Sequence, residues 1–149
     1  MTPNKILLIE DNHSDIELTR RALVKNHISN ELVVLEDGQE ALDYLFGEGE
    51  YARQSPDLLP ALVLLDLNLP RVGGLEVLRR IRGAERTRRL PVVILTSSVE
   101  EQDMASGYDL GTNSYVQKPV DFTRFTQAIL QLGLYWLILN EPPPEVRQS

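Results

Sequence analysis

Five polar residues of this chain could take part in chemistry, and each stands close to the end of a short apolar run. They are Glu10, Asp11, Asp66, Thr96 and Lys118. Carboxylates that share a site repel one another and raise one another's pKa values unless a cation holds them. Mg²⁺ would resolve this conflict, because it takes one or two carboxylates, keeps several waters and binds phosphoryl oxygens. With an ammonium group and a hydroxyl added, the set is suited to phosphoryl transfer.

Asp66 is the least expected of these residues, because it follows four apolar residues in the segment LVLLDLNLPRVGG. Burying an ionised carboxylate is costly unless a partner compensates it. An aspartate after a strand is often a turn residue, but here the turn signal comes only at Pro70. Glu10 and Asp11 could be solvated acids ahead of a helix N-terminus, where negative charge is favourable. Their occurrence together with Asp66 and Lys118 favours a shared site.

These side chains can meet only if the right elements position them. Short runs rich in Val, Ile and Leu lack the alternation of half-buried strands and suit strands buried on both faces. The runs span residues 5–9, 32–35, 62–65, 92–95 and 115–116. Segments with helical spacing begin near residue 14 and span residues 38–46, 74–82, 98–110 and 121–140. The first has Ser14 as its expected N-cap, with Glu17 three residues later as in a capping box.

Strands that alternate with helices predict an α/β fold, a doubly wound five-stranded parallel sheet with helices on both faces. The flavodoxin-like order 2-1-3-4-5 fits this number of strands best, and an extended C-terminal helix follows the fifth. Sites in such sheets form in the crevice beyond the carboxyl ends of the strands. In this order the first strand lies beside the third, so all five polar residues can converge there.

The composition excludes several classes of protein. The 149 residues suffice for one ordinary domain, and the formal net charge of -7 argues against general affinity for nucleic acid or anionic membranes. The absence of cysteine excludes disulfides, thiolate zinc sites and cysteine nucleophiles, and His13 and His27 cannot build a metal site by themselves. Because we find no N-terminal signal and no apolar stretch long enough for a bilayer, we expect a cytoplasmic protein without membrane or nucleic-acid partners.

An arginine-rich segment could suggest nucleic-acid binding. Its members are Arg79, Arg80, Arg82, Arg86, Arg88 and Arg89. Aromatic residues are not interleaved with them and the chain is acidic, so we interpret the segment as a solvated helix face and loop. A role in docking an acidic partner surface stays open.

Taken together, the motifs resemble the response-regulator receiver domain of two-component signalling. The motifs are Glu10-Asp11, Asp66 in LLDLNLP with Gly73-Gly74 after it, Thr96 in VVILTSS, and Lys118-Pro119 in YVQKP. The resemblance covers about residues 5–132, and the motifs stand in the family's order at the expected strand ends. We therefore expect a receiver domain over residues 1–140 and a flexible tail over residues 141–149.

The resemblance implies a phosphorylation site on Asp66. It implies that Asp66 accepts a phosphoryl group from a sensor histidine kinase, and that a carboxylate nucleophile forms an aspartyl phosphate. It also implies that Glu10, Asp11, Asp66 and the Asn68 carbonyl hold Mg²⁺. Glu10 departs from the commonest receiver pattern, which has aspartate there, but its longer side chain still reaches a metal or its waters.

The resemblance further implies a switch that reports phosphorylation. Lys118 would pair with one phosphoryl oxygen, and Thr96 would move to hydrogen-bond another. Tyr115 would then turn into the space that Thr96 leaves, which changes the surface of the fourth helix, fifth strand and fifth helix. The Lys118–Pro119 bond is a candidate for the cis form, which aims the lysine at the site in this family.

The subfamily can be inferred from less specific features. The long loop before the third strand, the DLNLP spelling and the C-terminal extension with Trp136 and prolines resemble the single-domain response regulators of phytochromes. This resemblance implies a phytochrome-type, light-sensing histidine kinase as partner. Too few residues follow the last helix for an output module, so we expect signalling by protein contact.

The last helical segment carries two apolar rows. The first row should pack on the sheet and consists of Phe122, Phe125, Ile129, Leu132, Trp136 and Leu139. The second row, on roughly the opposite side, consists of Leu130, Leu134 and Leu137. A helix that is apolar nearly all round is usually buried on both sides. We therefore expect the second row to form a homodimer interface, the alternative being that the tail folds back over it.

Two other functions compete with the phosphoacceptor switch. One is an adaptor with a receiver fold that works without phosphorylation, which would not need the whole polar set. The other is an aspartyl-nucleophile phosphatase resembling the haloacid dehalogenase family. That family places its nucleophile after the first strand in a DxD motif, whereas Asp66 follows the third predicted strand and has Asn68 two residues later.

Overall fold

A parallel sheet forms the centre of the molecule in the computed structural model, which describes residues 5–49, 59–97 and 114–132. The strands are β1 (Ile6–Ile9), β2 (Leu32–Leu35), β3 (Leu62–Asp66), β4 (Val92–Thr96) and β5 (Ser114–Gln117), and they lie in the order β2-β1-β3-β4-β5. All four strand pairs are parallel. The predicted fold class and strand order are therefore confirmed.

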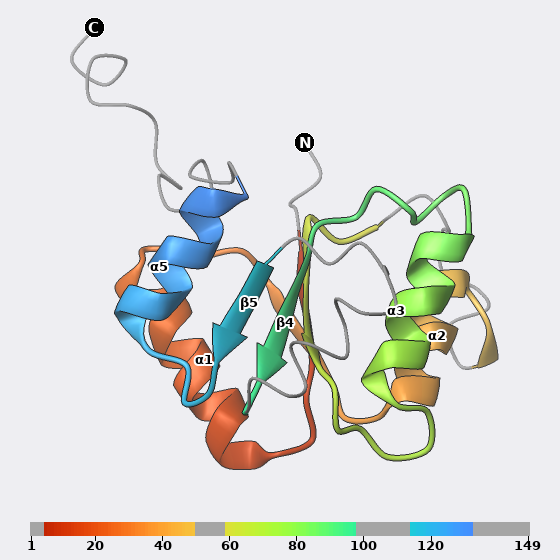
Figure 1. The fold of residues 1–149 in the computed structure, drawn as a ribbon, viewed down its shortest axis with the longest axis horizontal. Helices are drawn as coiled ribbons and strands as arrows, with labels where there is room; N and C mark the ends of the chain where they lie inside the picture. Colours follow the sequence, from red (N-terminus) through yellow and green to blue (C-terminus); the bar gives the residue numbers. More distant parts are fainter. Residues whose placement is uncertain (1–4, 50–58, 98–113, 133–149) are drawn as a thin grey trace, which may run out of the picture.

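Helices cover both faces of this sheet (Figure 1). They are α1 (His13–Lys25), α2 (Gly38–Phe46), α3 (Gly74–Gly83) and α5 (Phe122–Gln131). Helices α1 and α5 lie on one face and α2 and α3 on the other. The helix expected over residues 98–110 lies outside the described residues.

The strands form where the apolar runs stand because both of their faces are covered. In β1, Ile6 and Leu8 pack in the core beneath α1 and α5, whereas Leu7 and Ile9 pack in the core beneath α2 and α3. All four are completely buried. Successive side chains of a strand point to opposite faces, so a strand between two helical layers needs an apolar residue at every position. This is why the runs show no alternation.

The N-cap of α1 is Asn12 and not Ser14, which corrects the sequence prediction. Asn12 has an extended backbone, and its side-chain oxygen accepts a hydrogen bond from the Asp15 N–H at 2.9 Å. Ser14 already lies inside the helix. Residues that cap helices well stand at positions 11, 12, 14 and 15. Composition alone therefore left the start of this helix ambiguous.

Helix α5 packs on the sheet mainly through the predicted apolar row. Phe125 and Ile129 are completely buried, and Leu132 packs against the same core. Phe122 departs from the prediction, because this first residue of the helix is 45% exposed. Trp136 and Leu139 lie outside the described residues, as does the predicted boundary between the domain and the tail. Among the described helices, none is both long enough and apolar enough to cross a membrane.

Candidate functional site at the carboxyl edge of the sheet

The sheet brings the predicted polar residues to one edge. Asp66 is the last residue of β3 and Thr96 the last of β4, while Glu10 and Lys118 follow β1 and β5 directly. The strands are in register, with Ile9 beside Leu65 and Asp66 beside Leu95. Their carboxyl ends therefore lie at one level, and side chains from distant parts of the sequence meet.

An acidic cluster stands at the centre of this edge. One carboxylate oxygen from each of Glu10, Asp11 and Asp66 lies within 4.8 Å of the other two. Glu10 and Asp66 are buried, and Asp11 is exposed. Opposite ligands of an octahedral Mg²⁺ stand about 4.2 Å apart, twice the bond length of about 2.1 Å. The limit of 4.8 Å is slightly longer than this, so a small shift of the side chains, of which Asp11 is exposed, would let the three oxygens bind one small divalent cation.

Glu10 supplies a further sign that the cluster suits a metal ion. Its Oε2 accepts a hydrogen bond from the Asn12 N–H at 3.1 Å. Its Oε1 lies 2.8 Å from Lys118 Nζ, so the ammonium group is the charged partner of this buried oxygen. Burying the carboxylates of Glu10 and Asp66 side by side costs free energy that one ammonium group offsets only in part, and a bound cation would offset more of it. The donor set is all oxygen, which matches the preference of hard divalent ions.

Lys118 reaches three carboxylates from its position between β5 and α5. Its Nζ lies 2.8 Å from Glu10 Oε1, 3.1 Å from Asp66 Oδ1 and 3.1 Å from Asp15 Oδ2. The Lys118–Pro119 bond is cis, as predicted. Sequence reasoning missed Asp15, which comes from the first turn of α1 and not from a strand end. The available signal was its place one helical turn after the Glu10-Asp11 motif.

Burial and charge together shift the pKa values of the site. Burial, together with the charge of Asp66, raises the pKa of Glu10 to about 7, because these effects outweigh the hydrogen bonds from Lys118 and the Asn12 N–H. Burial also raises the pKa of Asp66 despite the nearby ammonium group. Burial by itself would lower the pKa of Lys118, but its contacts with Glu10, Asp66 and Asp15 raise it overall. The lysine therefore stays protonated, and burial disfavours the charged forms of Glu10 and Asp66 beside it.

Asn68 and the loop that carries it lie next to Asp66. The Asn68 N–H donates a hydrogen bond to the Asp66 carboxylate, which opposes the rise in its pKa. The loop turns back closely at Gly74, whose N–H donates to the Leu67 carbonyl at 3.0 Å. A Cβ atom at position 74 would stand 2.3 Å from the Asp66 carbonyl oxygen. Only glycine lets α3 begin this close to the end of β3.

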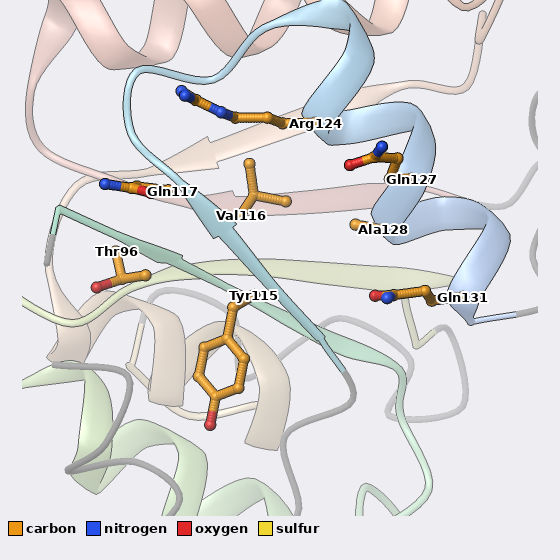
Figure 2. Close-up of a pocket in the computed structure, with 8 residues that line it drawn as sticks. All are labelled: Thr96, Tyr115, Val116, Gln117, Arg124, Gln127, Ala128 and Gln131. Carbon is orange, nitrogen blue, oxygen red and sulfur yellow. The ribbon is translucent and has the colours of Figure 1, made fainter. Parts of the chain in front are cut away.

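The predicted switch residues occupy neighbouring strands. Thr96 is 2% exposed at the end of β4, and its carbonyl accepts a hydrogen bond from the Lys118 N–H at 2.7 Å. Tyr115 is half-buried on β5 and packs against the core on the α2 and α3 face. Figure 2 shows its ring on the side of β5 away from Arg124 and Gln127 of α5. Both switch residues line one cavity of about 290 Å³ that also borders α5.

The chain and its site match a known protein family. The model of the response regulator receiver domain matches residues 6–130, which include every residue of the site. The chain belongs to the response regulator receiver family. A relative, the response regulator Rcp1 of Synechocystis, is 38% identical over 135 residues, which cover 91% of this chain and 90% of Rcp1.

Solved structures of receiver domains agree with this assignment. The bacteriophytochrome response regulator RtBRR is 49% identical with a TM-score of 0.87, and the match covers 99% of this chain and 88% of RtBRR. The phosphorylated cyanobacterial phytochrome response regulator RcpA is 40% identical with a TM-score of 0.72, covering 96% and 99%. The Mn²⁺-bound form of Rcp1 is 36% identical with a TM-score of 0.72, covering 95% and 99%. The chain is thus a receiver domain of the Rcp1 and bacteriophytochrome type.

Proposed function

We propose that this receiver domain is a phosphoacceptor switch in which Asp66 takes a phosphoryl group from a sensor histidine kinase. The observation that carries the proposal is the position of Asp66, which lies 3.1 Å from a lysine ammonium and within an acidic cluster able to bind a cation. RcpA, a relative of 40% identity, has been solved in a phosphorylated form. This supports the same chemistry here.

Each part of the proposed reaction has a group in the site. An Asp66 carboxylate oxygen attacks phosphorus and forms an acyl phosphate, while the P–N bond to the kinase histidine breaks and that nitrogen keeps the electron pair. Lys118 holds a phosphoryl oxygen through its ammonium group, and the loose transition state gains most from such positioning and electrostatics. Glu10, Asp11, Asp66 and the Asn68 carbonyl would hold Mg²⁺, which neutralises charge on the phosphoryl oxygens when it is bound.

The conformational change caused by phosphorylation would extend from Thr96 to the face formed by β5 and α5. A phosphoryl group brings a charge of about -1.5 to -2, which can draw the Thr96 hydroxyl inward. Tyr115 stands on the neighbouring strand and lines the same cavity, so it is placed to respond. We propose that partners read this change by protein contact, with no nucleic acid involved.

Phosphorylation is tested with a small phosphodonor. We expect acetyl phosphate and a Mg²⁺ salt to produce an acid-stable, base-labile adduct of one phosphoryl group, detected by intact mass. The adduct should be absent in Asp66→Asn and in chelator. No adduct in the wild-type protein would contradict the proposal and favour the adaptor function. Rapid multiple turnover of unrelated phosphate monoesters would favour the phosphatase instead.

We propose a phytochrome-type histidine kinase as the phosphodonor in the cell. The support is the set of relatives, which includes RtBRR, named as a bacteriophytochrome response regulator, at 49% identity. A purified phytochrome kinase carrying radiolabelled phosphohistidine should transfer the label to this protein within seconds, and not to Asp66→Asn. A kinase of another sensory class should transfer it much more slowly. Equal rates from both kinases would contradict this choice of partner.

A further inference from the structure

Lys118 has three carboxylate partners, and they differ in what happens to them during the proposed reaction. An ammonium group has three N–H donors, and Glu10, Asp66 and Asp15 each stand within 3.1 Å of Nζ. Glu10 and Asp66 belong to the acidic cluster, whereas Asp15 does not. The first two are thus shared between the lysine and the cation site, and Asp15 is not.

A cation in the cluster would weaken two of the three contacts. A carboxylate that binds a divalent ion has much of its charge neutralised, so it attracts an ammonium group less. The ion also repels the ammonium, because both are positive. Phosphorylation then converts the Asp66 carboxylate into an uncharged acyl linkage, and the negative charge moves to the phosphoryl oxygens. Asp15 lies on α1 and is not part of the acidic cluster, so neither the cation nor the phosphoryl group binds to its carboxylate.

Two hydrogen bonds hold the backbone of Asp15 in place at the start of α1. Its backbone N–H is fixed by the N-cap bond to Asn12, and its carbonyl accepts a hydrogen bond from the buried Thr19 hydroxyl at 2.8 Å. Its side chain is 19% exposed, and that of Lys118 is 14% exposed. A pair this shielded from water interacts more strongly than an exposed ion pair. Fixing the long lysine side chain costs about 2 kcal/mol of rotamer entropy, and the contact with Asp15 helps to offset this cost.

We infer that Asp15 is a positioning residue that anchors the Lys118 ammonium beside Asp66 while the cation and the phosphoryl group occupy the site. Through this contact α1 takes part in phosphoryl transfer without touching the reacting atoms. The inference rests on the proposed phosphoacceptor function, and it extends that function to a residue outside the strand ends.

The first test measures the rate of phosphorylation by acetyl phosphate in saturating Mg²⁺. Asp15→Asn should slow adduct formation by about tenfold, the size expected when one hydrogen bond to a charged group is lost. Glu17→Gln is the matched control, because it removes one acid from the exposed face of the same helix. It should phosphorylate at the wild-type rate. A rate for Asp15→Asn within twofold of wild type, or faster than it, would overturn the inference.

A double-mutant cycle shows whether Asp15 acts through the lysine. In a Lys118→Ala background, adding Asp15→Asn should change the remaining rate by less than twofold. A further tenfold loss there would overturn the inference, because Asp15 would then act by another route. These outcomes differ from a failure of the proposed function, in which the wild-type protein itself forms no adduct.

A second readout is independent of the reaction rate. The Lys118 ammonium signal in nitrogen-15 NMR should be visible in the wild-type protein, since its protons are held in hydrogen bonds away from water. In the presence of Mg²⁺ and beryllofluoride, a stable substitute for the phosphoryl group, the signal should persist in wild type and Glu17→Gln and disappear in Asp15→Asn. Persistence in Asp15→Asn would show that the anchor lies elsewhere and would overturn the inference.

Discussion

At the scale of single residues, the site holds more negative charge than its lysine can balance. The carboxylates of Glu10, Asp15 and Asp66 surround one ammonium, and Asp11 stands at the edge. Such an arrangement lowers the stability of the cation-free protein and raises its affinity for a cation. Function and stability are therefore in conflict at this point of the molecule.

Asp66→Asn should stabilise the protein when no divalent cation is present. The raised pKa of Asp66 means that its charged form is disfavoured in the folded state. A neutral amide of similar shape removes the free-energy cost of burying that charge. We expect the free energy of unfolding in urea with a chelator to rise by about 1 kcal/mol at neutral pH.

In Mg²⁺, the wild-type protein should instead be more stable than Asp66→Asn. Ligand binding to the folded state stabilises the wild-type protein, and the variant has lost one of the ligands. The same urea titration in Mg²⁺ measures the change, and Glu17→Gln serves as a control for the loss of one charge. A variant that gains as much from Mg²⁺ as wild type would show that Asp66 is not a ligand.

At the scale of elements, close backbone approaches set how the loops surround Asp66. Helix α3 starts against the Asp66 carbonyl at Gly74, and α2 starts against the loop after β3 at Gly38, where a Cβ would stand 1.8 Å from the Val72 carbonyl oxygen. The Gly38 N–H also donates to the Pro70 carbonyl at 3.2 Å. The first residues of α3 and α2 are therefore in close contact with the end of β3 and the loop that follows it.

Two glycine substitutions in α3 should have opposite effects. Gly74→Ala forces a Cβ into backbone atoms and should lower the free energy of unfolding by about 2 kcal/mol or more. Gly83→Ala, at the other end of the helix, meets no atom within 4 Å and should raise it by about 0.5 kcal/mol, because alanine favours helix. Chemical denaturation of both variants tests this. Equal effects would mean that the approach at position 74 is not tight.

The N-terminus of α2 should show a dependence on pH through Asp37. Burial would raise the pKa of Asp37, but hydrogen bonds from the Glu40 N–H and Arg71 outweigh it and lower the pKa overall. Arg71 Nη2 lies 2.9 Å from both Asp37 oxygens. A lowered pKa means that the charge of Asp37 contributes stability above its ordinary value of 3.8, and that this is lost as the pH falls through the folded-state pKa.

Asp37→Asn keeps a good N-cap and removes the charge. It should lower the free energy of unfolding by about 0.5 kcal/mol at pH 7, as is typical of a largely exposed ion pair. The difference from wild type should shrink as the pH falls below the ordinary pKa of an aspartate. Urea unfolding at pH 7 and at a pH below that pKa measures the difference in free energy of unfolding. A difference that does not depend on pH would contradict this account.

At the scale of the whole molecule, the predicted dimer interface is described only at its start. Leu130 is 54% exposed on α5, directly after the completely buried Ile129, while Leu134 and Leu137 lie outside the described residues. A homodimer through this row therefore stays a prediction. It would place the interface beside the cavity that Thr96 and Tyr115 line.

Leu130→Glu should shift the protein from dimer to monomer, because a charge cannot be buried without a partner. Val24→Glu is the matched control, since Val24 is an apolar residue that is 71% exposed on α1 and the substitution adds the same charge. Light scattering over a range of concentrations, with and without phosphorylation, measures the outcome. A wild-type protein that is monomeric at high concentration in both states would contradict the predicted interface.

The sequence by itself determined the fold and the carboxyl-end site. Unbroken apolar runs such as residues 62–65 identify strands between two helical layers, and parallel strands necessarily bring their last residues to one edge. Glu10, Asp66, Thr96 and Lys118 could be placed together for that reason, without knowledge of any distance between them.

The tertiary structure alone decided the contacts that do not follow from strand order. That Asp15 reaches Lys118 depends on how α1 packs beside β5 and α5, which short-range patterns do not encode. The choice of Asn12 over Ser14 as N-cap, and the exposure of Phe122, depend on where each helix begins against the sheet. Periodicity identifies which face of a helix is buried, but packing sets the first residue of that helix and the partners of its polar side chains.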